Sequence, residues 1–243
     1  MAGERGGLLF LIGGTDRGIV KRVAEPFVAA AGGEEATVAL LLMGGEGWEG
    51  YVPRYMAPWE ARGVRRVEVI VPKEDGKLDL IEVGRQLGEA TGIFIGGGHT
   101  ARYHELYATE PVRSLVRERH QEGVPVAGLS AGAMIAPQVC LLRPSPRNPD
   151  ECFRIVEGLG LVRELVVEVH FTEGVGLGSQ TYAALVEGMA RMRVARGLGI
   201  GSGACAVLRE GRLEGVIGRG VWEITMTDFE KGRYSFREIR REA

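Results

Sequence analysis

The chain has 243 residues, of which 30 are basic and 32 acidic, so its formal charge at neutral pH is −2. The 45% share of hydrophobic residues excludes a disordered chain. The balanced charge gives no argument for a nucleic-acid partner or an anionic membrane, and no apolar run reaches the ~20 residues of a spanning helix. Three scattered cysteines (Cys140, Cys152 and Cys205) predict neither a disulfide framework nor a metal site. We therefore expect a soluble, cytoplasmic protein.

Glycine clusters follow short apolar runs at four places in the first half of the chain. The pairs are Leu8–Ile12 with Gly13-Gly14, Val38–Met43 with Gly44-Gly45, Ile93–Ile95 with Gly96-Gly97-Gly98, and Val124–Ala127 with Gly128 and Gly132. Continuous apolar runs of this length are typical of strands buried on both faces. Segments with helical spacing lie between them at Arg17–Ala31, Leu78–Ala90 and Val112–Gln121. This alternation predicts βαβ units and a parallel sheet.

The pattern changes after Gly158. We predict a strand at Leu165–Val169, a helix at Gln180–Arg193, and short strands at Gly197–Ile200, Cys205–Arg209, Arg212–Ile217 and Val221–Met226. The Glu210-Gly211 pair suits a hairpin turn, and the prolines of Arg143–Asp150 indicate a surface loop. The sequence therefore predicts one α/β domain over residues 1–243, with a parallel core and an antiparallel extension at its C-terminal edge.

The clearest motif for catalysis follows the apolar run at 124–127. Gly128-Leu129-Ser130-Ala131-Gly132 has the Gly-x-Ser-x-Gly pattern of a nucleophile elbow, in which a sharp strand-to-helix turn exposes a serine. Ligands of open α/β sheets bind beyond the carboxyl ends of the strands, where this serine is expected. We predict that Ser130 is a nucleophile and that the Ala131 N–H helps to bind an oxyanion. The alternative is a glycine-rich turn with an incidental serine.

The glycine loop at 96–98 is the second candidate element. Backbone amides without a neighbouring Cβ can approach a ligand closely and donate to developing negative charge. Gly97 or Gly98 is therefore expected to supply the other oxyanion donor, and His99 to contact the substrate. Taken alone, the loop is equally consistent with a tight turn or an anion-binding loop.

A serine nucleophile needs a base, and four histidines are available. His170 directly follows the predicted strand at 165–169, so it stands at a strand's carboxyl end and is the favoured base. His99 is the alternative, whereas His104 and His120 are expected on the surface. For the acid that orients the base, Asp150 in the proline-containing loop is the first candidate. The alternatives are Glu151, Glu168 and Glu173.

These motifs together resemble peptidase family S51, the family of dipeptidase E and cyanophycinase. The resemblance is carried by Leu9–Gly14, Phe94–Gly98, Leu115–Gly123, Gly128–Ala133, Gly158–Leu161, Val169–Phe171 and Gly197–Gly201. It implies a class I glutamine amidotransferase-like (flavodoxin-like) three-layer sandwich, with serine where amidotransferases carry cysteine. It also implies Ser130 as nucleophile, His170 as base and no metal or organic cofactor. His99-Thr100 is similar to the Asn-Thr of the dipeptidase E branch, so both residues are expected to bind substrate.

The chain departs from the family pattern near the base. Cyanophycinases carry Asp-Gln before the catalytic histidine and an arginine-rich stretch after it; here Glu168-Val169 precede His170, and residues 172–180 contain no arginine. Their triad glutamate lies in a Gly-Ile-Asp-Glu-like segment, where this chain has Gly201-Ser202-Gly203-Ala204. Dipeptidase E takes its acid from the loop after the serine, where Asp150 falls.

We therefore expect a serine peptidase that hydrolyses short peptides, aspartyl peptides among them, through a Ser-His-acid site. The alternatives are a cyanophycinase-like peptidase, a catalytically impaired binding protein that lacks the usual acid, and an α/β-hydrolase esterase. The esterase is disfavoured because its histidine normally comes late in the chain. The expected partner is a small peptide, and a homodimer stays open because the family contains monomers and dimers.

Overall fold

The computed structural model describes residues 6–143, 153–171 and 177–240. Its first sheet has the strand order β11-β10-β1-β5-β4-β2-β3. These strands are β1 (Leu8–Ile12), β2 (Thr37–Leu41), β3 (Arg66–Ile70), β4 (Gly92–Ile95), β5 (Val126–Leu129), β10 (Ala204–Arg209) and β11 (Arg212–Gly218). β1 to β5 run parallel, and β10 and β11 are antiparallel at one edge. The parallel strands β1, β2, β4 and β5 are apolar and buried because helices cover both faces, whereas the edge strand β3 is partly exposed.

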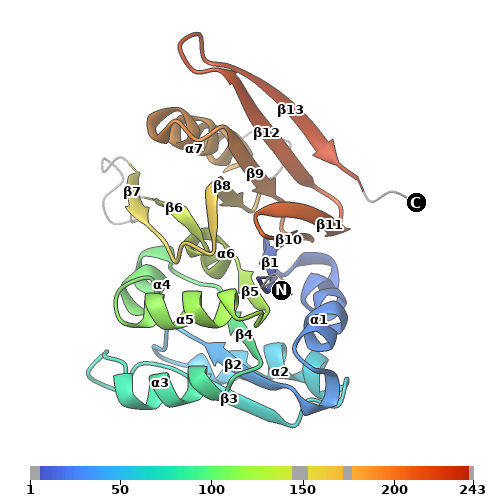
Figure 1. Ribbon diagram of the computed structural model, residues 1–243, viewed down its shortest axis with the longest axis vertical. Coiled ribbons are helices and arrows are strands. Elements are labelled where there is room, and N and C mark those ends of the chain that lie inside the picture. The colour runs from blue at the N-terminus through green and yellow to red at the C-terminus, as the bar shows by residue number, and fades with distance from the viewer. Residues whose placement is uncertain (1–5, 144–152, 172–176, 241–243) are drawn as a thin grey trace, which may run out of the picture.

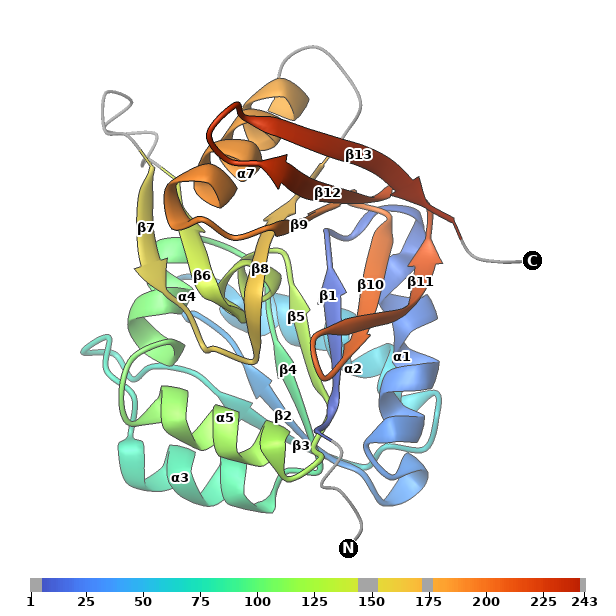
Figure 2. The same cartoon turned by 45° about the horizontal axis from the view of Figure 1, so that its top comes forward.

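A second sheet has the order β13-β12-β9-β8-β6-β7 and occupies the upper part of the view in Figure 1. Its strands are β6 (Pro137–Leu142), β7 (Arg154–Glu157), β8 (Val162–Val169), β9 (Arg196–Ile200), β12 (Val221–Asp228) and β13 (Arg233–Ile239). β6, β8 and β9 run parallel, while β7, β12 and β13 are antiparallel to their neighbours. Figure 2 places β8 and β9 near β1 and β5 of the first sheet.

The helices divide between the faces of the sheets. α1 (Ile19–Ala30) and α2 (Val52–Glu60) cover one face of the first sheet, and α3 (Leu80–Glu89), α4 (Thr100–Tyr107) and α5 (Val112–Gln121) cover the other. The short α6 (Ala131–Ile135) leads from β5 to β6, and α7 (Leu177–Met192) packs on β8 and β9. Ile19, Val23 and Phe27 of α1 lie at helical spacing and are all buried.

An aromatic cluster fills the core beneath α1 and α2. The Trp59 and Phe94 rings lie 5.1 Å apart, and those of Phe27 and Phe94 lie 6.0 Å apart in an edge-to-face arrangement. All three side chains are completely or almost completely buried. This packing fixes α2 against the end of β4, next to the glycine loop that begins at residue 96.

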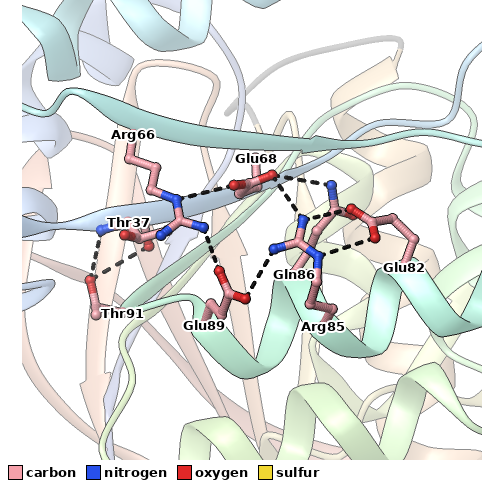
Figure 3. Close-up of polar contacts among 8 residues, drawn as sticks. All are labelled: Thr37, Arg66, Glu68, Glu82, Arg85, Gln86, Glu89 and Thr91. Carbon is pink, nitrogen blue, oxygen red and sulfur yellow. Dashed lines mark hydrogen bonds and ion pairs between the residues drawn. The ribbon is translucent and has the colours of Figure 1, made fainter.

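Charged side chains cover the outer edge of the first sheet (Figure 3). Arg66 on β3 forms ion pairs with Glu68 and with Glu89 on α3, and Arg85 on α3 contacts Glu89 at 3.0 Å and Glu82 at 2.6 Å. These pairs are exposed, so each contributes little to stability. Charges along an edge strand do, however, discourage pairing with another chain.

The predicted strands and helices are present in the α/β fold, but their arrangement differs from the expected one. The segments at 165–169 and 197–200 do not extend the first sheet; they form the centre of a second one. The reason is β6, a strand that was not predicted. α6 has only five residues, and Pro137 then starts a strand, a position that proline tolerates. β6 pairs with β8 and thereby begins the second sheet.

His120 corrects another expectation. It was predicted on the surface, yet it is 7% exposed, and Nδ1 lies 3.2 Å from the carbonyl oxygen of Val124. Burial lowers its pKa below the usual value. His104 is half-buried, with Nε2 2.9 Å from the Glu157 carbonyl oxygen. Within the described ranges, no helix combines the length and apolar character that a membrane crossing requires.

Candidate active site

Ser130 sits at the turn between β5 and α6 in a strained backbone conformation. Its φ and ψ are 50° and −105°, a region that a residue with a side chain rarely adopts. The Ser130 N–H donates to the Ile12 carbonyl at 2.8 Å, and the Gly132 N–H donates to the Gly96 carbonyl at 3.2 Å. A Cβ at Gly132 would lie 2.4 Å from the Ile95 carbonyl oxygen, so the turn can pack against β4 only with glycine there. Ser130 therefore lies at a sharp, tightly packed strand-to-helix turn.

His170 follows β8 directly and faces the serine. The backbone N–H of His170 donates to the Gly13 carbonyl at 3.2 Å, and this bond joins the end of β8 to the end of β1. Ser130 Oγ and His170 Nε2 are 2.8 Å apart, within hydrogen-bond distance. The structure therefore brings together the two residues that the sequence favoured as nucleophile and base.

The other ring nitrogen of His170 contacts a hydroxyl group. Nδ1 lies 2.8 Å from Ser202 Oγ, in the turn between β9 and β10. When Nε2 accepts a hydrogen bond from the Ser130 hydroxyl, Nδ1 of the neutral ring carries the hydrogen and donates it to Ser202 Oγ. The Ser202 carbonyl in turn accepts from the Asp16 N–H at 3.0 Å.

Ser202 was not among the predicted site residues. The sequence signal was present, because this residue falls in the segment where cyanophycinases carry their triad glutamate. That family pattern predicts a carboxylate at this place, whereas this chain has a serine hydroxyl. A hydroxyl can still orient the ring, but it supplies no negative charge to stabilise an imidazolium.

Of the four predicted acids, the structure describes one. Asp150, Glu151 and Glu173 lie outside the described residues. Glu168 is described, but its Oε2 pairs with an Arg143 nitrogen at 2.5 Å, and the described side-chain partners of the His170 ring are Ser130 and Ser202. The Glu168 side chain is completely buried, and Oε1 has no hydrogen-bond partner within the described part of the chain. Burial raises the pKa of Glu168 to about 7, although Arg143 opposes the shift.

The electrostatic surroundings keep His170 neutral near pH 7. Partial burial lowers its pKa below the usual value, and the positive charge of Arg143 acts in the same direction. Asp16 opposes both by favouring the charged ring. A neutral imidazole is the form that can accept a proton from the serine.

The candidate oxyanion donors surround the serine. Ala131 begins α6, and a first-turn amide has no intrahelical acceptor. Gly97 packs against Ser130, since an added Cβ would lie 3.2 Å from Ser130 Cβ. Its N–H is directed to the Tyr55 hydroxyl, at a long 3.4 Å. The Gly97 amide thus already has an acceptor, and the oxyanion roles of Ala131, Gly97 and Gly98 stay predictions.

A cavity of about 510 Å³ opens beside these groups. Ser130, His170, Gly97 and Gly98 line it, together with residues of α1, α2 and the turns before them. His99 and Thr100, the predicted substrate contacts, lie at the start of α4 next to the glycine loop but outside the cavity lining. No cluster of His, Cys, Asp or Glu suited to a metal ion occurs among the residues that the structure describes.

The fold and this site are those of an α/β protein with a serine–histidine pair at a strand-to-helix elbow. The chain matches peptidase family S51 over residues 9–213 and belongs to that family. It is 26% identical over 175 residues to a cyanophycinase of Trichormus variabilis, covering 68% of this chain and 56% of the relative. A cyanophycinase of Synechococcus elongatus is 26% identical over 170 residues, covering 68% of this chain and 52% of the relative. The chain thus spans about half the length of these relatives.

Two solved structures share the fold. A peptidase from an acI-B1 Actinobacterium has a TM-score of 0.67 at 16% identity, covering 99% of this chain and 97% of its own. A putative peptidase E protein from Listeria monocytogenes has a TM-score of 0.62 at 18% identity, covering 88% of this chain and 98% of its own. At these identities the likeness concerns the fold alone.

Replacement of Ser202 by alanine tests its contact with the base. We expect kcat to fall roughly tenfold, because one neutral hydrogen bond that orients the ring is lost, while KM changes little. Steady-state kinetics on a peptide substrate measure both. Ser235→Ala, at an exposed position on β13, is the matched control and should behave as wild type. Unchanged kcat in Ser202→Ala would show that this hydroxyl does not support the base.

Proposed function

We propose that the protein is a serine peptidase that hydrolyses short peptides. The observation that carries the proposal is the 2.8 Å contact between Ser130 Oγ and His170 Nε2 at a strained elbow. Membership of peptidase family S51 supports hydrolysis of peptides as the reaction class. The proposal includes the class I glutamine amidotransferase-like (flavodoxin-like) arrangement of the parallel sheet.

The contacts suggest how the reaction proceeds. Ser130 Oγ attacks the peptide carbonyl while His170 Nε2 takes its proton, and the amide N–H groups of Ala131 and Gly98 bind the oxyanion. His170 then returns the proton to the leaving amine, which departs and leaves an acyl-enzyme. A water molecule activated by the same histidine releases the acid. Ser202 keeps Nδ1 protonated throughout, and the charge of Asp16 favours the transient imidazolium.

A second candidate is a binding protein with impaired catalysis. It is favoured by one observation: among the described residues, a hydroxyl and not a carboxylate contacts His170 Nδ1. A serine site without its acid nevertheless keeps part of its rate from the oxyanion hole and binding. Cyanophycinase-like activity has the sequence relatives in its favour, but the arginines expected after the histidine are missing from residues 172–180.

Covalent labelling separates these candidates. Wild type and Ser130→Ala are incubated with a small fluorophosphonate, and intact mass is measured. We expect a single adduct on wild type and none on the variant, since only an activated serine reacts with this reagent. Labelling that survives in Ser130→Ala would refute the nucleophile. Absence of labelling in both proteins would favour the binding protein.

A further inference from the structure

The charged side chains that line the cavity indicate which chemical group of a substrate binds there. Among the described residues, those that line the cavity include two cations, Lys21 and Arg54, and no aspartate or glutamate, although the charge of Asp16 acts on His170 from outside the lining. Most arginines near α2 and α3 pair with carboxylates, as Arg62 and Arg85 do. Neither Lys21 Nζ nor the Arg54 guanidinium has a carboxylate within ion-pair distance in the described part of the chain.

Arg54 is held in place by an aromatic ring. Its guanidinium carbon lies 5.2 Å from the centre of the Tyr51 ring, a cation–π geometry. Tyr51, Arg54, Tyr55 and Pro58 recur at helical spacing and line the same wall of the cavity. Tyr51 is 53% exposed, so it is available to cover a ligand as well as to stack on the arginine.

Tyr55 connects this wall to the serine. Its hydroxyl accepts the Gly97 N–H, and within the described part of the chain its phenolic hydrogen has no acceptor, so it can donate to a ligand. Burial raises the pKa of Tyr55, so the group is a neutral donor at physiological pH. Arg54 and Tyr55 of α2 and Lys21 of α1 thus bring a guanidinium, a phenol and an ammonium to the cavity lining, a set of donors that suits a carboxylate.

We propose that Arg54 and Lys21 bind a carboxylate of the peptide and thereby determine specificity; this inference rests on the proposed function for the location of the scissile bond. The carboxylate comes either from the peptide's C-terminus or from an acidic side chain. A cavity of about 510 Å³ holds only a short segment of peptide, so the charged group lies within a few bonds of the carbonyl that Ser130 attacks.

Calorimetric titration of the Ser130→Ala protein tests the inference without turnover. Three probes are compared: Ala-Ala-Ala, its C-terminal amide, and the amide of Ala-Asp-Ala. If the site takes the terminus, the free acid should bind about tenfold more tightly than either amide. If it takes a side chain, the aspartyl amide should bind about tenfold more tightly than the alanine amide.

Arg54→Gln and Lys21→Gln, each added to Ser130→Ala, should remove the preference for the carboxylate and leave binding of the alanine amide unchanged. Arg65→Gln, at an exposed arginine outside the cavity lining, is the matched control and should keep the preference. Equal binding of acid and amide probes by the parent, weak or strong, would overturn the inference. So would a preference that survives both substitutions.

Failure of the carboxylate site and failure of the proposed peptidase activity can be told apart by experiment. A fluorophosphonate without a carboxylate should label Arg54→Gln as fast as wild type, because the change leaves Ser130 and His170 in place. A preference that depends on Arg54 in a protein that is not labelled would uphold the carboxylate site and refute the peptidase. Labelling of Ser130 in a protein that shows no preference for a carboxylate would support the peptidase and refute the carboxylate site.

Discussion

His170→Gln is expected to lower kcat/KM by roughly 10⁴-fold or more, because the serine loses the only base within hydrogen-bond distance in the described structure. The glutamine amide cannot accept and return a proton at neutral pH. Fluorophosphonate labelling should slow by a comparable factor, since it also needs an activated hydroxyl. Both rates are measured beside His99→Gln, the change at the alternative base that the sequence offered.

His99→Gln should keep the labelling rate, because His99 lies outside the cavity lining. A wild-type labelling rate in His170→Gln, or its loss in His99→Gln, would reverse the assignment of the base. The pH profile gives a further check. Labelling requires neutral His170, so the rate should rise with pH through its pKa. That pKa is below the usual value, so the acid limb should lie below about pH 6.5.

Much of the fold follows from local patterns in the sequence. Apolar runs that end in glycine predicted β1, β2, β4 and β5, and the elbow motif located Ser130 at the carboxyl end of β5. Such patterns report which faces are buried, but they do not report which strand pairs with which. The second sheet depends on the pairing of β6 with β8, two segments that are separated in the chain, and no local sequence pattern predicts this pairing.

The candidate site was predictable in its nucleophile and base but not in its third member. Ser202 contacts His170 because Gly13 and Gly14 let the ends of β1, β8 and β9 approach closely; a Cβ at Gly14 would lie 2.8 Å from Ser202 Cβ. Close approach of this kind depends on three segments far apart in the chain. The burial of His120 was not predicted for the same reason. The space beside its ring depends on Gly7, where a Cβ would lie 3.0 Å from Nδ1.

The buried Glu168 carries the largest expected effect on stability. Its pKa is about 7 in the folded chain against 4.5 for the free group, so the native state binds the proton more tightly than the unfolded state does. Stability therefore falls as pH rises from 4.5 to 7 and is constant above that, with a total loss of roughly 3 kcal/mol. Glu168→Gln should remove this loss and flatten the profile.

Arg143→Met should have the opposite effect, because it leaves a buried carboxylate without its partner. At pH 8 we expect a loss of about 3–5 kcal/mol relative to wild type. Near pH 4 the loss should be small, since Glu168 is then protonated in both proteins. The double variant Arg143→Met, Glu168→Gln should recover most of the stability at pH 8. Urea unfolding at both pH values measures these differences, and an Arg143→Met penalty that is equal at pH 4 and pH 8 would show that the loss comes from packing and not from the buried charge.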